Sequence, residues 1–253
     1  MDLRLSRRVG IKVAVGVLVA ASTAIMPTAT AVPSNIAGMV VFIDPGHNGS
    51  NDGSINRQVP TGRGGTKDCQ TSGTATNSGY MEHTFTWDTA LRVRAELSAL
   101  GVRTALSRAN DSGLGPCVDE RANAANALHP NAVLSIHADG GPPSGRGFHV
   151  NYSAPPLNQV QAGPSVQYAR IMRDQMQGAG IPPANYIGQN GLYGRSDLTG
   201  LNLAQYPSIL VECGNMKNPA DSALMESAEG RQKYADALVR GVAGFLASQG
   251  QAR

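Results

Sequence analysis

The chain has 253 residues, of which 41% are hydrophobic, enough for one α/β domain with a sizeable core. Its formal net charge is +3, but residues 1–31 carry four of the 21 Lys and Arg and one of the 18 Asp and Glu, which leaves 17 of each. This neutral remainder gives no support for binding to nucleic acid, so no nucleic-acid partner is expected.

The N-terminus has the parts of a secretory signal peptide. Basic residues precede an uncharged apolar run, 13–26, which is followed by the small-x-small sequence Ala29-Thr30-Ala31. The run is shorter than the ~20 residues of a membrane-spanning helix. We therefore expect residues 1–31 to be a leader and 32–253 to be an exported domain with no stable membrane anchor after cleavage. An uncleaved membrane anchor is the alternative.

The first element after the leader is a short β-branched run, 40–43, which ends at Asp-Pro-Gly and is followed by His47. Such a run, stopped by a turn signal, predicts a buried strand. Residues 48–79 are rich in Gly, Ser, Thr and Asn and are predicted to be a long loop beside His47, which could contain a short hairpin at 63–65. Loops of this length are usually functional.

A helix is predicted next, capped by Asn77 or Ser78 and continuing to Gly101. Glu82 and His83 lie in its first turn. Side chains of neighbouring helical residues point about 100° apart, so only one of the two can face the strand ends. The pattern alone does not choose between them.

The remaining pattern predicts alternating strands and helices. The strands are expected at 102–107, 133–136 and 208–211, with an edge strand at 148–152, and the helices at 119–128, at 165–177 and, as one or two helices, within 221–248. Residues 178–205 are predicted to be glycine-rich loop. This alternation predicts a single α/β domain with a mostly parallel, mixed sheet flanked by helices on both faces.

Three of the predicted strands each lead into a side chain that can bind a metal or transfer a proton. These are His47 after the first strand, His137 after 133–136 and Glu212 after 208–211. The C-terminal ends of parallel strands lie at one edge of a sheet, where α/β proteins place their sites. We therefore expect the three side chains to converge.

The cysteines are expected to supply one disulfide. Cys69 and Cys117 lie in polar, glycine-rich sequence, whereas Cys213 follows an apolar strand and is predicted to be a buried thiol. Export to an oxidising compartment favours a bond. The pairing Cys69–Cys117 is therefore expected, although spacing alone allows three pairings.

The residues at the predicted strand ends are those of a catalytic zinc site. Such a site uses three His, Glu or Asp ligands and a water, and a further carboxylate carries the proton. His47 and His137 can supply nitrogen ligands, Glu82 or His83 the third ligand, and Glu212 the proton carrier. Each residue also has a structural alternative: the histidines as hydrogen-bonding groups, Glu82 as a complement to the helix N-terminus, and Glu212 in an ion pair.

Four segments resemble the motifs of the zinc-dependent N-acetylmuramoyl-L-alanine amidases of the cell-wall amidase type 3 family. They are VFIDPGHNG, the early-helix Glu82, RANAANALHPNAVLSIHAD and PSILVECGNMKN. The resemblance covers residues 39–246. It implies one Zn²⁺ per chain held by His47, Glu82 and His137, with Glu212 as the catalytic general acid/base, and it favours Glu82 over His83.

The resemblance also implies an activity. The family cleaves the amide between the muramic acid lactyl group and L-Ala of the stem peptide, so peptidoglycan or soluble muropeptides are the expected partners, in the periplasm, cell wall or extracellular space. Arg195 and Asn202 are candidate substrate contacts, and a monomer is expected. The alternatives are a zinc peptidase that acts on stem peptides and a non-catalytic wall-binding or regulatory protein on the amidase fold.

After Glu-x-Gly, where the family often has an aromatic or apolar residue, this chain has Asn215, with Lys217 beyond it. No repeat domain for wall binding is recognisable in the sequence. We expect low affinity for intact wall and faster turnover of soluble muropeptides than of sacculi. Parallel assays at equal stem-peptide concentration test this expectation. Faster cleavage of sacculi would contradict it.

Overall fold

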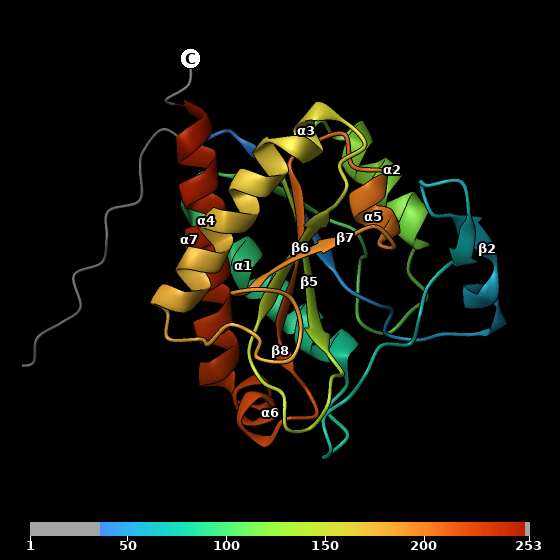
Figure 1. Ribbon diagram of the computed structural model, residues 1–253, viewed down its shortest axis with the longest axis vertical. Helices are drawn as coiled ribbons and strands as arrows, with labels where there is room; N and C mark the ends of the chain where they lie inside the picture. Colours follow the sequence, from blue (N-terminus) through green and yellow to red (C-terminus); the bar gives the residue numbers. More distant parts are fainter. Residues whose placement is uncertain (1–35, 251–253) are drawn as a thin grey trace, which may run out of the picture. The chain divides into compact units, whose positions relative to one another are not determined.

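The computed structural model describes residues 36–250, so the predicted leader lies outside the described part. Its centre is a six-stranded mixed sheet (Figure 1). In pairing order the strands are β4 (Arg103–Leu106), β1 (Val40–Pro45), β5 (Ala132–Asp139), β8 (Ser208–Asn215), β6 (His149–Ser153) and β7 (Leu192–Arg195). The first four are parallel, β6 is antiparallel to β8, and β7 is parallel to β6. The predicted fold class is confirmed.

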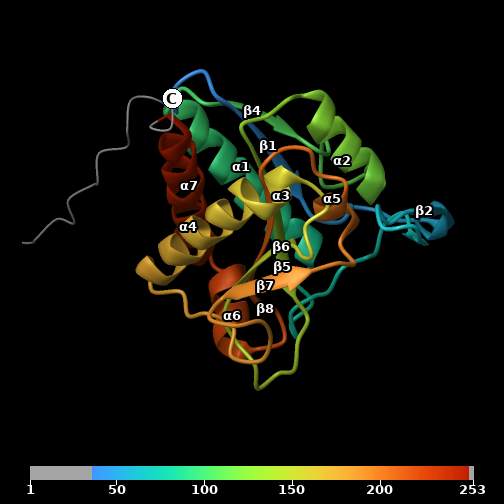
Figure 2. The same ribbon diagram turned by 45° about the horizontal axis from the view of Figure 1, so that its top comes forward.

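Helices lie on both faces of the sheet (Figures 1 and 2). One group of helices is α1 (Glu82–Ala99), α4 (Pro164–Gly178) and α7 (Ala228–Gly250), and on the opposite side lie α2 (Val118–Ala127) and α5 (Thr199–Asn202). The short helices α3 (Gln159–Ala162) and α6 (Pro219–Glu226) precede α4 and α7. Among residues 36–250, no helix combines the length and apolar character needed to span a membrane.

Strand alternation separates the core from the candidate site. Ile43 of β1, Ile136 of β5 and Val211 of β8 are fully buried in the main core with the apolar side chains of α1, α4 and α7. The residues that follow or precede them on these strands point to the opposite face. That face, beneath α2 and α5, therefore receives the polar side chains of β1, β5 and β8, including His137 and Glu212.

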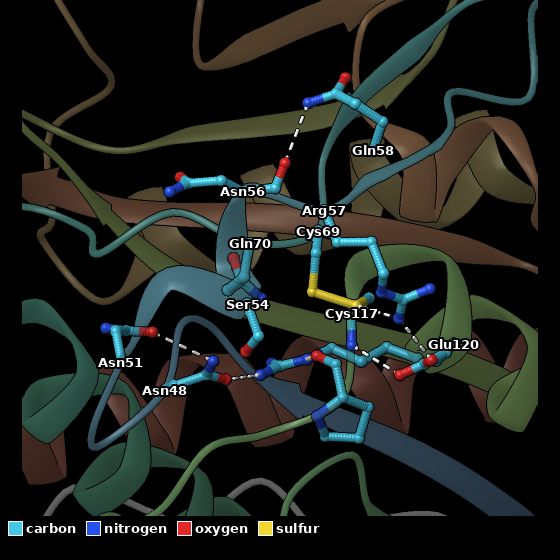
Figure 3. The surroundings of a disulfide bond; sticks show 12 residues. Asn48, Asn51, Ser54, Asn56, Arg57, Gln58, Cys69, Gln70, Cys117 and Glu120 are labelled. Carbon is cyan, nitrogen blue, oxygen red and sulfur yellow. Dashed lines mark hydrogen bonds and ion pairs between the residues drawn. A yellow bond between two sulfur atoms is a disulfide. The ribbon is translucent and has the colours of Figure 1, made fainter.

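The long segment after β1 contains a 3₁₀ helix, η2 (Gly53–Asn56), and the hairpin of β2 (Gln58–Pro60) and β3 (Thr66–Asp68). The hairpin therefore forms where the sequence allows one. Its base is joined to α2 by the predicted Cys69–Cys117 disulfide (Figure 3), while Cys213 is a buried free thiol. Its tip is held to α5, where Nε of Arg63 donates to Oδ1 of Asn202 at 2.9 Å.

The predicted start of the first helix is wrong. Helix α1 begins at Glu82, with Met81 as its N-cap and no side-chain capping bond. The residues proposed as caps lie in a turn instead, because the backbone N–H of Thr76 donates to the carbonyl of Tyr80 at 2.9 Å. A bridge between Ala75 and Met81 closes this turn, and the helix starts only after it.

The predicted edge strand at 148–152 is also misplaced in the sheet. Strand β6 pairs with β8 on one side and with β7 on the other, so the edge strand is β7. Strand β7 and helix α5 both lie within 178–205, which was predicted to be loop. The four residues of β7 include Gly194 and closely follow Gly188 and Gly191, so local composition does not indicate the strand, which forms by pairing with β6.

The disulfide is expected to contribute substantially to stability because it joins two cysteines that are 48 positions apart in the sequence. In the chain-entropy model, a closed loop of this length corresponds to about 4 kcal/mol. We expect the double substitution Cys69→Ala and Cys117→Ala to lower the free energy of unfolding by about 2–4 kcal/mol in urea denaturation. Reductant should destabilise the wild type and leave the double variant unchanged. Equal stability of the oxidised wild type and the variant would contradict this.

Candidate metal centre

His47 lies in a constrained turn just after β1. Its φ angle is +63°, a left-handed conformation that costs a non-glycine residue about 1–3 kcal/mol. The turn is joined to β5 by a hydrogen bond from the N–H of Gly46 to the carbonyl of Ile136 at 3.0 Å. The His47 ring donates from Nδ1 to the carbonyl of Thr71 at 2.8 Å. Since a carbonyl can only accept, Nδ1 carries a proton, and Nε2 is the ring nitrogen that remains to face Glu82 or a metal.

Glu82, the first residue of α1, brings a buried carboxylate to this histidine. Its Oε2 lies 3.0 Å from Nε2 of His47, and its Oε1 lies 3.0 Å from Nδ1 of His137. Each oxygen also accepts a backbone hydrogen bond, from Thr74 at 3.0 Å and from Ala138 at 3.1 Å. The carboxylate is thus held by the loop, by β5 and by both imidazoles.

Burial and neighbouring charges act in opposite directions on the pKa values of Glu82 and His47. Burial raises the pKa of Glu82, but the charge of His47 and hydrogen bonds from both histidines outweigh burial and hold this pKa far below its usual range. Burial lowers the pKa of His47, and the Glu82 carboxylate outweighs burial and raises it. The buried carboxylate therefore stays ionised and attracts positive charge to this position.

Glu82 and the two histidines each offer one ligand atom, and these atoms all lie within 4.8 Å of one another. Two imidazoles and one carboxylate are a common donor set for catalytic zinc. The structure brings Glu82 to this position rather than His83, whose Nδ1 lies 2.9 Å from a carboxylate oxygen of Asp111. The two alternatives left by the helical pattern are therefore distinguished by geometry.

Glu212 lies beside this cluster because it is the register partner of His137 in the pairing of β5 with β8. Its Oε2 is buried and has no hydrogen-bond partner within the described chain. Burial raises the pKa of Glu212 well above its ordinary value, and the charges of Glu82 and Asp139 raise it further, while Arg195 opposes them. A carboxyl group with a raised pKa and a buried oxygen that lacks a partner is a candidate acid/base group.

Arg195 and Asn202, the two candidate substrate contacts, differ in how exposed their side chains are. Arg195 lies at the end of β7, stacks on the Tyr193 ring at 5.0 Å and pairs with both carboxylate oxygens of Asp197 at 2.7 and 2.6 Å. Asn202 is buried, and its side-chain amide donates to the carbonyls of Thr61 and Ser196. Asn202 therefore anchors the hairpin, whereas the Arg195 side chain is partly exposed and its charge acts on Glu212.

A cavity of about 150 Å³ extends from the cluster along the sheet. Its lining includes His47, His137 and Leu210 of β8, together with apolar residues of α2 and α5. Strand β3 of the hairpin contributes Lys67 to the wall. The protein thus has space for a small ligand group beside the two histidines.

Two glycines leave room for the converging side chains. A Cβ atom on Gly46 would overlap the His137 ring. A Cβ atom on Gly73, which has φ +78°, would lie 2.9 Å from Oε2 of Glu82 and 2.9 Å from Cδ2 of His47. This requirement is not among the features predicted from the sequence, although the Gly that immediately precedes His47 is a signal of close backbone approach.

Comparison with known proteins defines the class. Residues 41–244 match the family Amidase_3, N-acetylmuramoyl-L-alanine amidase, and the chain belongs to this family. It is 83% identical to N-acetylmuramoyl-L-alanine amidase Rv3717 of Mycobacterium tuberculosis, over 94% of this chain and 99% of that protein.

Solved structures agree with this assignment. The crystal structure of the N-acetylmuramyl-L-alanine amidase Ami1 from Mycobacterium smegmatis is similar with a TM-score of 0.85 and 76% identity, over 85% of this chain and 100% of that chain. The amidase AmiC2 of Nostoc punctiforme gives a TM-score of 0.63 at 26% identity, over 83% of this chain and 99% of that chain.

The glycine requirement can be tested directly. We expect Gly46→Ala to displace the His137 ring and to weaken Zn²⁺ binding at least about 10-fold, the scale seen when groups that orient a ligand are lost. Gly53→Ala is the control, because a Cβ atom there meets nothing within 4 Å. Competition with a chromophoric chelator measures both affinities. Equal affinities for the two variants would contradict the predicted crowding.

Proposed function

We propose that the chain is an exported zinc-dependent N-acetylmuramoyl-L-alanine amidase. The observation that carries the proposal is the convergence of His47, Glu82 and His137, with Glu212 on the neighbouring strand. Membership of the amidase family and 83% identity to a protein named as such an amidase support the same activity. The leader at residues 1–31 would deliver the domain to the compartment that contains peptidoglycan.

The three clustered side chains fit a zinc ion. His47 would bind through Nε2, since its Nδ1 proton is used by the carbonyl of Thr71. Glu82 and His137 would supply the other two ligands, which leaves a fourth position open, as in catalytic zinc sites. When bound, zinc supplies a Lewis acid that makes water nucleophilic near neutral pH.

Glu212 would move the proton. In amide hydrolysis a water attacks the lactyl carbonyl carbon, the C–N bond to L-Ala breaks, and the departing nitrogen must gain a proton. As a carboxylate, Glu212 would take the proton from the attacking water and then donate it to that nitrogen. Its raised pKa suits the second step, because the protonated form persists at higher pH than in an ordinary glutamate.

The substrate would be peptidoglycan or a soluble muropeptide. The partly exposed Arg195, whose charge acts on Glu212, would contact an anionic or polar group of the stem peptide. The polar groups of Asn202 are used by the hairpin, so its influence on substrate would act through the position of that hairpin.

Removing the proposed proton carrier should separate metal binding from turnover. We expect Glu212→Gln to retain zinc while turnover falls by about 10²–10⁴-fold, because a positioned acid/base group contributes on that scale. Glu229→Gln, an exposed substitution of the same type on α7, is the matched control. Zinc content by metal analysis and muropeptide turnover are the two measurements.

Mass analysis of the digest identifies the bond that is cut. The amidase releases sugar free of peptide together with the intact stem peptide, whereas a stem-peptidase leaves amino acids attached to the sugar. Peptide remaining on the sugar, or unchanged turnover in Glu212→Gln, would contradict the proposed function.

A further inference from the structure

Arg121 of α2 is a buried arginine whose hydrogen bonds converge on the turn that carries His47. Its side chain is only 4% exposed. Nη2 donates to the carbonyl of His47 at 2.7 Å and to Oδ1 of Asn48 at 2.8 Å. Nη1 donates to the carbonyl of Pro45 and to Oδ1 of Asp44, both at 2.9 Å. One guanidinium thus binds the backbone on both sides of Gly46.

The remaining donor connects this turn to the beginning of α2. Nε of Arg121 donates to the carbonyl of Pro116 at 3.0 Å. The neighbouring Cys117 is the N-cap of α2 and is bonded to Cys69, whose carbonyl accepts from the N–H of Val118 at 2.9 Å. Figure 3 shows Asn48 in the surroundings of this disulfide. The guanidinium therefore lies between a covalently fixed helix end and the His47 turn.

The turn needs such support because His47 has a left-handed backbone. A conformation of this kind persists only where the surroundings over-determine it. A planar guanidinium with five donors in fixed directions can bind the successive acceptors together, whereas a lysine ammonium cannot reproduce that fork. All five N–H groups of Arg121 have an acceptor.

We propose that Arg121 is a positioning residue of the metal centre: it fixes the backbone of His47 so that Nε2 of the ring is directed at Glu82 and the metal position. This inference rests on the proposed zinc site. Arg121 itself does not touch the metal position through a side-chain atom. It acts through the peptide groups of residues 45 and 47 and through Asn48.

Arg108 provides a matched comparison. It is also buried, and its Nε donates to the carbonyl of Pro45 at 3.2 Å, but its other bonds go to His83, Thr86, Asn110 and Asp111. It therefore supports the same strand end without contacting His47 or Asn48. If burial and charge alone mattered, replacing either arginine would have the same consequence for the metal centre.

The test is the Zn²⁺ dissociation constant of folded Arg121→Lys and Arg108→Lys, measured against a chromophoric chelator, with folding checked by circular dichroism. We expect Arg121→Lys to bind zinc about 10–100-fold more weakly than wild type, the scale of lost outer-sphere support. Arg108→Lys should change affinity by less than about fivefold, the effect of a single hydrogen bond, while both variants unfold at lower temperature. Wild-type affinity in Arg121→Lys, or equal losses in both variants, would overturn the proposal.

Asn48→Ala decides the question if Arg121→Lys does not fold. It removes one acceptor of Nη2 and leaves the guanidinium in place, so a loss of about fivefold in zinc affinity is expected and an unchanged affinity would overturn the proposal. Failure of the wild type to bind zinc would contradict the proposed function, and with it the role of Arg121. Zinc binding by the wild type with full affinity in the variants would contradict only the role of Arg121.

Discussion

The structure depends on the ionised carboxylate of Glu82 buried between two imidazoles. A charge removed from water is costly unless partners surround it. Two backbone N–H groups and the nearby rings of His47 and His137 supply those partners. They come from a loop, from β5 and from the turn after β1, so satisfying one carboxylate requires these distant segments to meet. The requirement that stabilises the charge also assembles the donor set for a metal.

The order of the parallel strands brings His47, His137 and Glu212 together at one edge of the sheet. Strands β1 and β5 are neighbours, and their C-terminal ends place the two histidines next to each other, with ring centroids 4.8 Å apart. Strand β8 follows, and its register sets Glu212 opposite His137. The proposed proton carrier is thereby separated from the ligand cluster by one strand spacing. Burial and the charges of Glu82 and Asp139 raise its pKa, and its Oε2 has no hydrogen-bond partner among the described residues.

Much of the arrangement of these strand ends is predictable from the sequence, because a short apolar run that ends in a turn signal indicates where a strand ends. The strands before His47, His137 and Glu212 are predicted in this way, whereas the Cys69–Cys117 pairing follows from the polar, glycine-rich sequence around both cysteines. The start of α1 was missed because a bridged turn, and not a polar cap, precedes Glu82. The position of β6 inside the sheet and the existence of β7 depend on long-range pairing, which local composition does not contain. The support of the His47 turn by an arginine of α2 likewise has no local signal, since an arginine in a first helical turn ordinarily faces solvent.

The most direct test of the account is a crystal structure of the zinc-loaded protein with anomalous data at the zinc edge. We expect one peak per chain, about 2.0–2.2 Å from a nitrogen of His47, a nitrogen of His137 and an oxygen of Glu82. Glu212 should lie close enough to contact a water in the open position. A zinc peak bound elsewhere, or a loaded site from which the carboxylate of Glu82 is turned away, would contradict the account.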